Sequence, residues 1–171
     1  MRFLELAQER YSVRSFRQDP VEDAKMERIL QAGRVAPTAC NFQPQKVFVV
    51  KSPEMRERLA AVCRFTFGAP VILVVAYDPA LCWKNKRMNS HPSGETDAAI
   101  VTTHMMLAAH EEGIGSCWVG VFSSDEVKAA LDLPQELVVT ALMPMGYPAA
   151  DASPAPFHSE IRNREETVFE L

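Results

Sequence analysis

The first third of the chain places its apolar residues mainly at helical spacing. Residues 2–9 read as a short amphipathic helix, and apolar side chains then recur every three or four positions from Met26 to Val35. Asp19-Pro20 has the residues of a helix start, with a capping carboxylate followed by proline at the first helical position. We therefore expect one helix over 2–9 and a second helix that starts at Asp19-Pro20 and is ended by Pro37.

Short β-branched runs further along the chain predict strands. Residues 47–50, 116–122 and 137–142 are brief runs of this kind, each bounded by turn residues. Residues 70–77 are apolar without interruption, which is typical of a central strand that is buried on both faces. The strand over 70–77 should therefore lie in the middle of the sheet.

Further helices separate these strands. Ser52-Pro53 and the capping box that opens at Ser123 predict two helix starts. The helix expected over 96–112 has almost no polar face, and Gly113 is expected at its C-terminal end. A helix that is apolar nearly all round must be covered on most sides. In a chain this short, a second subunit is the expected cover.

Together these elements predict one α+β domain over 1–171, built in layers around a sheet of four or five strands. Residues 79–95 are polar and irregular, as in a surface loop or lid that would shape a substrate pocket. The tail at 149–171 has almost no periodic apolar pattern and cannot fold alone. We expect it to fray or to wrap over another surface.

Charge and cysteine spacing exclude several classes of protein. The net charge of −4 argues against a nucleic-acid or anionic-membrane binder, and no apolar run is long enough to span a bilayer. The four cysteines form no close pair and no zinc spacing, and His104 and His110 do not share a helix face. With no leader sequence apparent, we expect a cytoplasmic protein with reduced thiols and without a metal site.

The segment 36–44, Ala-Pro-Thr-Ala-Cys-Asn-Phe-Gln-Pro, has the composition of a loop. It carries two side-chain amides, Asn41 and Gln43, between two prolines. An amide offers both a donor and an acceptor, so it can match the edge of a flat heterocycle. The commoner role of such residues is to satisfy a turn, and both interpretations stay open.

The segment 10–16, Arg-Tyr-Ser-Val-Arg-Ser-Phe, places the hydroxyl of Ser12 between the guanidinium groups of Arg10 and Arg14. Guanidinium groups suit phosphate. The alternatives are a helix cap for Ser12 and solvated surface charges for the two arginines. With the amide loop, this segment could hold a molecule with a planar head and a phosphorylated tail, such as flavin mononucleotide (FMN).

Across about 150 residues the chain resembles the FMN-dependent nitroreductase family, in a short bacterial or archaeal form. The segments that carry the resemblance, in chain order, are Arg10–Arg14, Ala36–Pro44, Pro70–Tyr77, Ser93–Ile100, Met106–Gly120 and Gly146–Pro148. The resemblance implies a mostly antiparallel central sheet flanked by helices. It also implies an interlocked homodimer with two FMN sites at the subunit interface.

The resemblance also implies roles for individual residues. Arg10, Ser12 and Arg14 would contact the phosphate and ribityl chain. Pro37, Thr38 and Ala39 would lie along the ring edge, with Asn41 as an amide contact and Gln43 serving the partner's flavin. Val119, Gly120 and Val121 would form the strand end whose backbone approaches flavin N5. In the tail, Arg162 is the best match for a further phosphate contact and Arg164 the second.

The implied activity is the transfer of hydride from NADH or NADPH through the flavin to nitroaromatic, quinone or related small-molecule acceptors. Because the flavin carries the redox chemistry, no catalytic side chain is required, and the backbone of Gly120 would act near N5. Glycine permits a close approach there because it has no side chain. Two alternatives remain: a flavin-binding or sensing module without turnover, and a specialised chemistry such as flavin fragmentation or dehalogenation.

Overall fold

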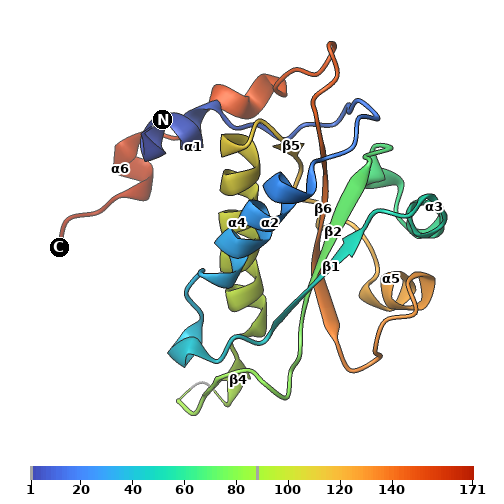
Figure 1. The fold of residues 1–171 in the computed structure, drawn as a ribbon. Helices are drawn as coiled ribbons and strands as arrows, with labels where there is room; N and C mark the ends of the chain where they lie inside the picture. The colour runs from blue at the N-terminus through green and yellow to red at the C-terminus, as the bar shows by residue number, and fades with distance from the viewer. Residues whose placement is uncertain (1, 88) are drawn as a thin grey trace.

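A four-stranded antiparallel sheet runs through the middle of the molecule, with helices on both faces (Figure 1). The computed structural model describes residues 2–87 and 89–171. The strands lie in the order β1-β2-β6-β5, with bounds Gln45–Val50, Val71–Tyr77, Val138–Gly146 and Gly115–Ser116. Neighbouring strands are antiparallel throughout, as expected from the family resemblance.

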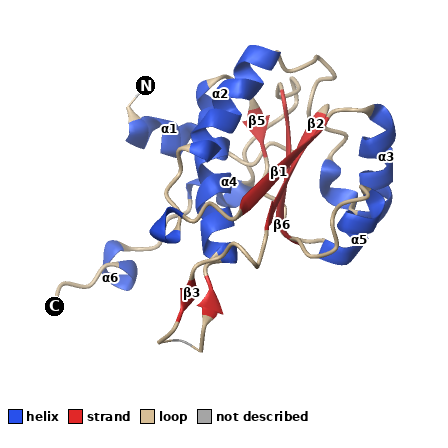
Figure 2. Cartoon of the chain, turned by 60° about the horizontal axis from the view of Figure 1, so that its bottom comes forward, coloured by secondary structure: helices blue, strands red, loops and turns tan. Residues whose placement is uncertain are grey.

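Two helices cover each face of this sheet (Figure 2). The helices α2 (Asp23–Arg34) and α4 (Gly94–Glu111) pack on one face. The helices α3 (Pro53–Val62) and α5 (Ser124–Ala130) pack on the other. The helix α1 (Phe3–Glu9) contacts α4 outside these layers. The prediction of an α+β layered domain is confirmed.

Strand β2 shows why the layers form. Every one of its residues is buried. Val71, Leu73 and Val75 belong to the core beneath α2 and α4, whereas Ile72 and Val74 belong to the core beneath α3 and α5. Because successive side chains of a strand point to opposite faces, an unbroken apolar run contributes side chains to the cores on both faces of the sheet.

The predicted start of the second helix is wrong. Helix α2 begins at Asp23, and Glu22 before it has extended backbone. Val21 is buried in the core, and the Glu22 carboxylate accepts a hydrogen bond from the Tyr147 hydroxyl at 2.6 Å. These two anchors keep Val21 and Glu22 out of the helix, so Pro20 does not occupy the first helical position.

The strand expected over 116–122 is also much shorter in the structure. Strand β5 ends at Ser116, and after it only Val119 pairs with β6, through Leu142. The Cys117 N–H still donates to the Pro144 carbonyl at 3.1 Å. Pro144 has no N–H group, so it cannot donate the second hydrogen bond of this pair to the Cys117 carbonyl. The regular ladder is interrupted at this proline, although Val119 still exchanges two hydrogen bonds with Leu142, and the chain leaves the sheet after Val119.

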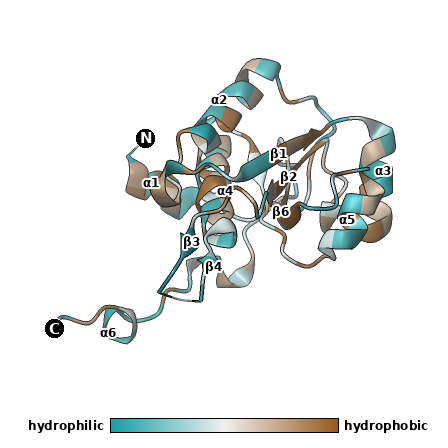
Figure 3. Ribbon diagram, turned by 90° about the horizontal axis from the view of Figure 1, so that it is seen from below, coloured by the Kyte–Doolittle hydropathy of each residue, from teal (hydrophilic) through white to brown (hydrophobic). Residues whose placement is uncertain are grey.

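The polar segment 79–95 contains a small hairpin that the sequence did not predict. It pairs β3 (Lys84–Asn85) with β4 (His91–Pro92) and leads directly into α4. The hairpin is hydrophilic and projects from the body of the molecule (Figure 3). The segment is therefore exposed, as expected of a surface loop, but its backbone is more regular than the sequence predicts.

The tail is tied to the body only at its beginning. The turn at Pro156–Ser159 packs near α1, where a His158 ring nitrogen lies 3.2 Å from the Gln8 carbonyl oxygen. Beyond it α6 (Arg164–Thr167) extends away from the body (Figure 1). Phe157, Ile161 and Phe169 are each at least 73% exposed. Within the described ranges, no helix has both the length and the apolarity needed to cross a membrane.

A polar network joins the start of α2 to the turn after β6. The Tyr147 hydroxyl donates to Glu22 and accepts from the Lys25 ammonium group at 2.9 Å, and Lys25 also donates to the Glu112 carbonyl. The hydrogen bond from Tyr147 lowers the pKa of Glu22 below its ordinary value of 4.5. A carboxyl group with a lowered pKa stabilises the fold above pH 4.5, and this contribution is lost as pH falls through the folded-state pKa.

We expect Tyr147→Phe to lower the midpoint of urea unfolding slightly at pH 7, because it removes the hydroxyl from this network. The difference from the parent chain should shrink as pH falls from 4.5 through the lowered folded-state pKa of Glu22, since Glu22 then becomes protonated in both proteins. Urea unfolding at a series of pH values measures this difference. A difference that stays constant from pH 7 to pH 3 would contradict the role given to Glu22.

Candidate functional site

The segment Arg10–Arg14 lies extended beside strand β5. Ser12 forms a parallel bridge with Ser116, and the Val13 N–H donates to the Ser116 carbonyl at 2.9 Å. The Val13 side chain is buried. Because side chains alternate in extended backbone, Arg10, Ser12 and Arg14 fall on the side opposite Val13. The helix-cap interpretation of Ser12 is therefore wrong.

The Cys117 thiol is influenced by all three of these side chains. Burial raises the pKa of Cys117, while the positive charge of Arg14, a hydrogen bond with Ser12 and the charge of Arg10 act in the opposite direction. Arg14 also donates to the Ser12 carbonyl at 3.1 Å, and Arg10 contacts the Met106 sulfur at 3.7 Å. Arg10, Ser12 and Arg14, here called the arginine cluster, thus all lie near enough to Cys117 to act on its pKa.

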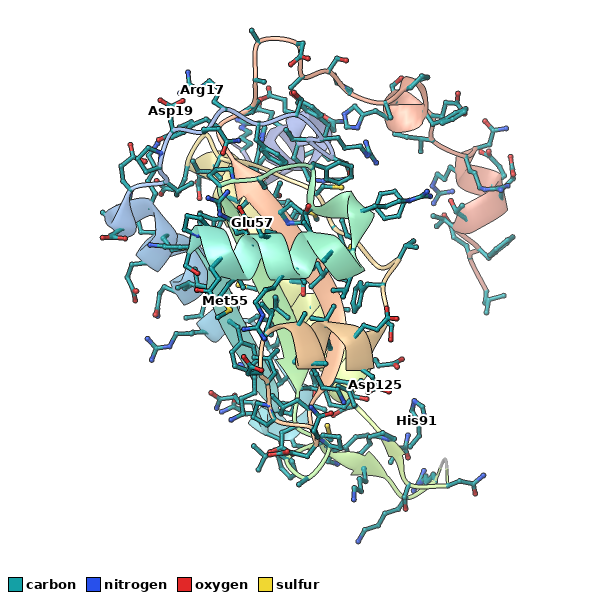
Figure 4. All side chains as sticks on the ribbon, turned by 90° about the vertical axis from the view of Figure 1, so that its right-hand side faces the viewer. Arg17, Asp19, Met55, Glu57, His91 and Asp125 are labelled. Atoms are coloured by element: carbon teal, nitrogen blue, oxygen red, sulfur yellow. The ribbon has the colours of Figure 1, made fainter. Side chains whose placement is uncertain are left out.

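The arginine cluster has unused capacity for an anion. Some exposed arginines elsewhere pair with carboxylates, as Arg17 does with Asp19 at 3.0 Å (Figure 4), whereas others, such as Arg34, are in no ion pair among the described residues. Within 2–87 and 89–171, no carboxylate lies within ion-pair distance of Arg10 or Arg14. Two guanidinium groups beside a hydroxyl, without a compensating carboxylate, form a favourable environment for phosphate.

One hollow is lined both by Arg14 and by the segment that follows β5. Its lining residues are Arg14, Phe65, Phe67, Cys117, Trp118, Val119, Gly120 and Val121. The structure therefore brings Arg14 together with the segment Val119–Val121, whereas Arg10 and Ser12 do not line this hollow. The sequence analysis did not identify Phe65 and Phe67, and their only signal was an aromatic pair just before the buried strand 70–77.

Gly120 lines this hollow, which we call the Gly120 hollow. The residue is exposed, and a Cβ atom built on it would meet no atom within 4 Å. In the described part of the chain, no group accepts a hydrogen bond from its N–H. Gly120 and Trp118 also line a second hollow with Glu95, Ala99 and Phe122. The Gly120 backbone is thus open to a ligand.

The loop 37–43 is held by its own hydrogen bonds and by one bond to α4. The Thr38 hydroxyl accepts from the Gln43 N–H at 3.1 Å, and the Gln43 amide donates to the Asn41 carbonyl at 3.3 Å. The side chains of Asn41 and Gln43 are exposed. The Ala39 N–H donates to the Asp97 carboxylate at 2.8 Å, in the first turns of α4.

This loop and the arginine cluster lie near opposite ends of α4 in one chain. Asp97 contacts the loop, whereas Met106 contacts Arg10, and nine residues of α-helix span about 14 Å. Pro37, Thr38 and Ala39 do not line the Gly120 hollow, nor do the two amides. Within a single chain, the structure does not bring the loop 37–43 to the arginine cluster.

The tail arginines form ion pairs within the tail. Arg162 pairs with Glu166 at 3.3 Å and Arg164 with Glu170 at 2.7 Å. Neither lines the Gly120 hollow. Among the residues that the structure describes, no three histidine, cysteine or acidic side chains lie close enough to hold a metal ion.

The chain is similar to known proteins over most of its length. The model of the nitroreductase family matches residues 7–65 and 62–147. A protein of Archaeoglobus fulgidus, named as a candidate NADH dehydrogenase/NAD(P)H nitroreductase, is 31% identical over 156 residues. That alignment covers 85% of this chain and 84% of the relative.

Solved structures give the same result. A nitroreductase family protein from Clostridium difficile 630 superimposes with a TM-score of 0.91 at 32% identity, covering 100% of this chain and 99% of the other. A candidate nitroreductase from Desulfovibrio desulfuricans, solved in complex with FMN, has a TM-score of 0.82 at 28% identity. The match covers 98% of this chain and 95% of that one.

Proposed function

This chain belongs to the nitroreductase family, and on that premise we propose that it is an FMN-dependent oxidoreductase that transfers hydride from NADH or NADPH to a small-molecule acceptor. Nitroaromatics and quinones are the acceptors that we propose. The observation that carries the proposal is that Arg14 and Gly120 line one hollow. Arg14 contributes a guanidinium group to that hollow, and Gly120 contributes exposed backbone.

The residues present fit FMN. Arg10, Ser12 and Arg14 would hold its phosphate, because the cluster has two guanidinium groups and no carboxylate partner among residues 2–87 and 89–171. The backbone of Val119–Val121 would lie along the ring, and the free N–H of Gly120 is a donor that needs no titratable group. When bound, the flavin supplies the hydride chemistry, and the protein supplies binding, orientation and electrostatics.

Aromatic side chains have a supporting role in this proposal. Phe65, Phe67 and Trp118 line the Gly120 hollow, and the ring centroids of the two phenylalanines lie 6.1 Å apart. Apolar walls exclude water from a bound ring and leave the polar backbone as its specific contact. These residues would hold the ring in place and take no part in proton transfer.

We further propose that the protein is a homodimer in which the loop 37–43 of one copy completes the FMN site of the other. Asn41 and Gln43 would then be amide contacts for the partner's flavin. The proposal is supported by the exposed amides of this loop and by its distance along α4 from the arginine cluster. The tail, with exposed Phe157 and Phe169, would cover the partner and bring Arg162 within reach of its phosphate.

Sedimentation velocity of the full chain at micromolar concentration tests the dimer. We expect a single species with the mass of two chains, because the apolar side chains of the tail lack cover within one chain. Removal of residues 160–171 should weaken this association. A monomer at micromolar concentration would contradict the proposal.

A cytoplasmic location is also proposed. It is supported by the four cysteines, which are all free in the structure, three of them buried. Free, separated thiols are typical of a reducing compartment.

Anaerobic reduction separates the proposed enzyme from a flavin-binding module without turnover. The FMN-loaded protein is mixed with NADH or NADPH in the absence of oxygen, and flavin absorbance is followed. The proposal predicts bleaching by at least one nucleotide, followed by recovery of colour when a nitroaromatic or quinone is added. A yellow protein that neither nucleotide bleaches would overturn the reductase assignment and leave flavin binding intact.

A further inference from the structure

Helix α4 carries a buried carboxylate near its start. Asp97 is 1% exposed, and each of its oxygens accepts a hydrogen bond. Oδ1 accepts from the Ala39 N–H at 2.8 Å, and Oδ2 accepts from the Ser93 hydroxyl at 2.6 Å. A carboxylate without such partners would be costly to bury, so the folded chain has a strong preference for keeping all three groups in place.

Asp97 joins two segments that are otherwise separate. Ala39 belongs to the loop 37–43. Ser93 lies at the base of the β3–β4 hairpin, where its N–H donates to the Trp83 carbonyl at 2.9 Å and its own carbonyl accepts from the Asp97 N–H. The loop, the base of the hairpin and the start of α4 therefore meet at this one side chain.

The loop depends on this contact for its position. Cys40, Asn41 and Gln43 have φ values of 50°, 56° and 52°, in the left-handed region that residues other than glycine rarely adopt. Such backbone persists only where its surroundings hold it. Across the described residues, the bond from Ala39 to Asp97 is the one hydrogen bond that ties residues 37–43 to another element.

We infer that Asp97 is a positioning residue, which holds the loop 37–43 in the conformation that contacts the flavin. This inference rests on the proposed function for the flavin contact, although the anchoring of the loop does not depend on it. Asp97 acts through Ala39 and has no role in the hydride transfer itself. Loss of the anchor should lower the fraction of molecules with a competent loop, which raises the apparent Kd for FMN by the same factor.

Two measurements on the full chain test this inference. The first is hydrogen exchange of the 37–43 backbone without FMN, and the second is the Kd for FMN by fluorescence titration. In Asp97→Ala we expect exchange at Ala39 to be at least tenfold faster and the Kd to rise about tenfold, because the Ala39 N–H has lost a charged acceptor.

The matched control is Thr102→Val, on the same helix. Thr102 is fully buried and donates to the Ala98 carbonyl at 2.7 Å, so the control removes a buried hydrogen bond without touching the loop. We expect it to leave loop exchange and the Kd within about twofold of the parent chain. Asp97→Asn, which keeps an acceptor oxygen without the charge, should fall between Asp97→Ala and the parent chain in both measurements.

The inference is overturned if Asp97→Ala matches Thr102→Val in both loop exchange and FMN affinity. If Asp97→Ala does not fold, Asp97→Asn and Ser93→Ala decide in its place, and both must exchange faster at Ala39 than Thr102→Val does. If the parent chain takes up no FMN, the proposed function fails, while the exchange measurement still decides whether Asp97 holds the loop.

Discussion

Arg14→Ala is expected to raise the Kd for FMN by roughly 10- to 150-fold, equivalent to about 1.5–3 kcal/mol for a lost charge-assisted hydrogen bond. Arg14 lies in the arginine cluster and also lines the Gly120 hollow, so it is the side chain that connects the two parts of the site. It has no carboxylate partner among the described residues, and its removal should cost little in folding. Fluorescence titration of FMN into the variant measures the loss.

Two matched variants show whether the loss of FMN affinity is specific to the guanidinium group of Arg14. One tests the shape of the charged group at this position, and the other tests the loss of an arginine elsewhere on the surface. Arg14→Lys keeps the charge without the planar guanidinium fork, so it should give an intermediate Kd. Arg58→Ala removes an arginine of α3 that pairs with Asp132 at 2.9 Å, and should leave the Kd unchanged. Equal FMN affinity in Arg14→Ala and Arg58→Ala would show that the phosphate binds elsewhere.

Gly120→Ala is expected to weaken FMN binding or slow reduction by NAD(P)H by about tenfold or more, with almost no effect on stability. A Cβ at this position meets no atom of the chain within 4 Å, so the folded protein accepts it. A bound ring lying against the Gly120 backbone would collide with the new methyl group, and overpacking of this kind typically costs about 1–3 kcal/mol. Urea unfolding without FMN and the Kd for FMN measure the two effects separately.

Gly94→Ala serves as a control in which the added methyl group should destabilise the fold. A Cβ on Gly94 would overlap the Tyr77 ring, so this substitution should lower the free energy of unfolding by about 1–3 kcal/mol. Gly120→Ala should be within about 0.5 kcal/mol of the parent chain in the same experiment. If Gly120→Ala alters neither FMN affinity nor reduction, the flavin ring does not lie against this backbone.

Much of the fold could be predicted because local chemistry decides it. The apolar run at 70–77 fills both cores, and Ser52 and Ser123 cap their helices by accepting from the N–H groups of Met55 and Glu126. The left-handed Gly113, with φ of 73°, ends α4. Each of these features depends on residues close together in the sequence.

The errors occur where distant contacts override local signals. Asp19-Pro20 has the residues of a helix start, but burial of Val21 and the bond from Tyr147 to Glu22 keep the chain extended. Residues 116–122 have the composition of a strand, but their partner strand presents Pro144, which has no N–H to donate. Neither partner can be identified from the local sequence.

The residues of the candidate site could be predicted from the sequence more readily than the contacts between them. The arginine cluster could be anticipated because alternation in one short extended segment brings Arg10, Ser12 and Arg14 to one side. The contact between Asp97 and Ala39 could not be anticipated from the sequence, because the two residues are 58 positions apart. Its only local signal is Ser93 four residues earlier, a spacing that also occurs in ordinary helix starts.

Uptake of FMN by the purified full chain tests the central claim most directly. An equilibrium titration, followed by quenching of flavin fluorescence, should show saturable binding of one FMN per chain and yield a yellow protein. Circular dichroism of the same sample establishes that the fold is intact. A correctly folded protein that stays colourless and leaves the fluorescence of added FMN unchanged would contradict the account.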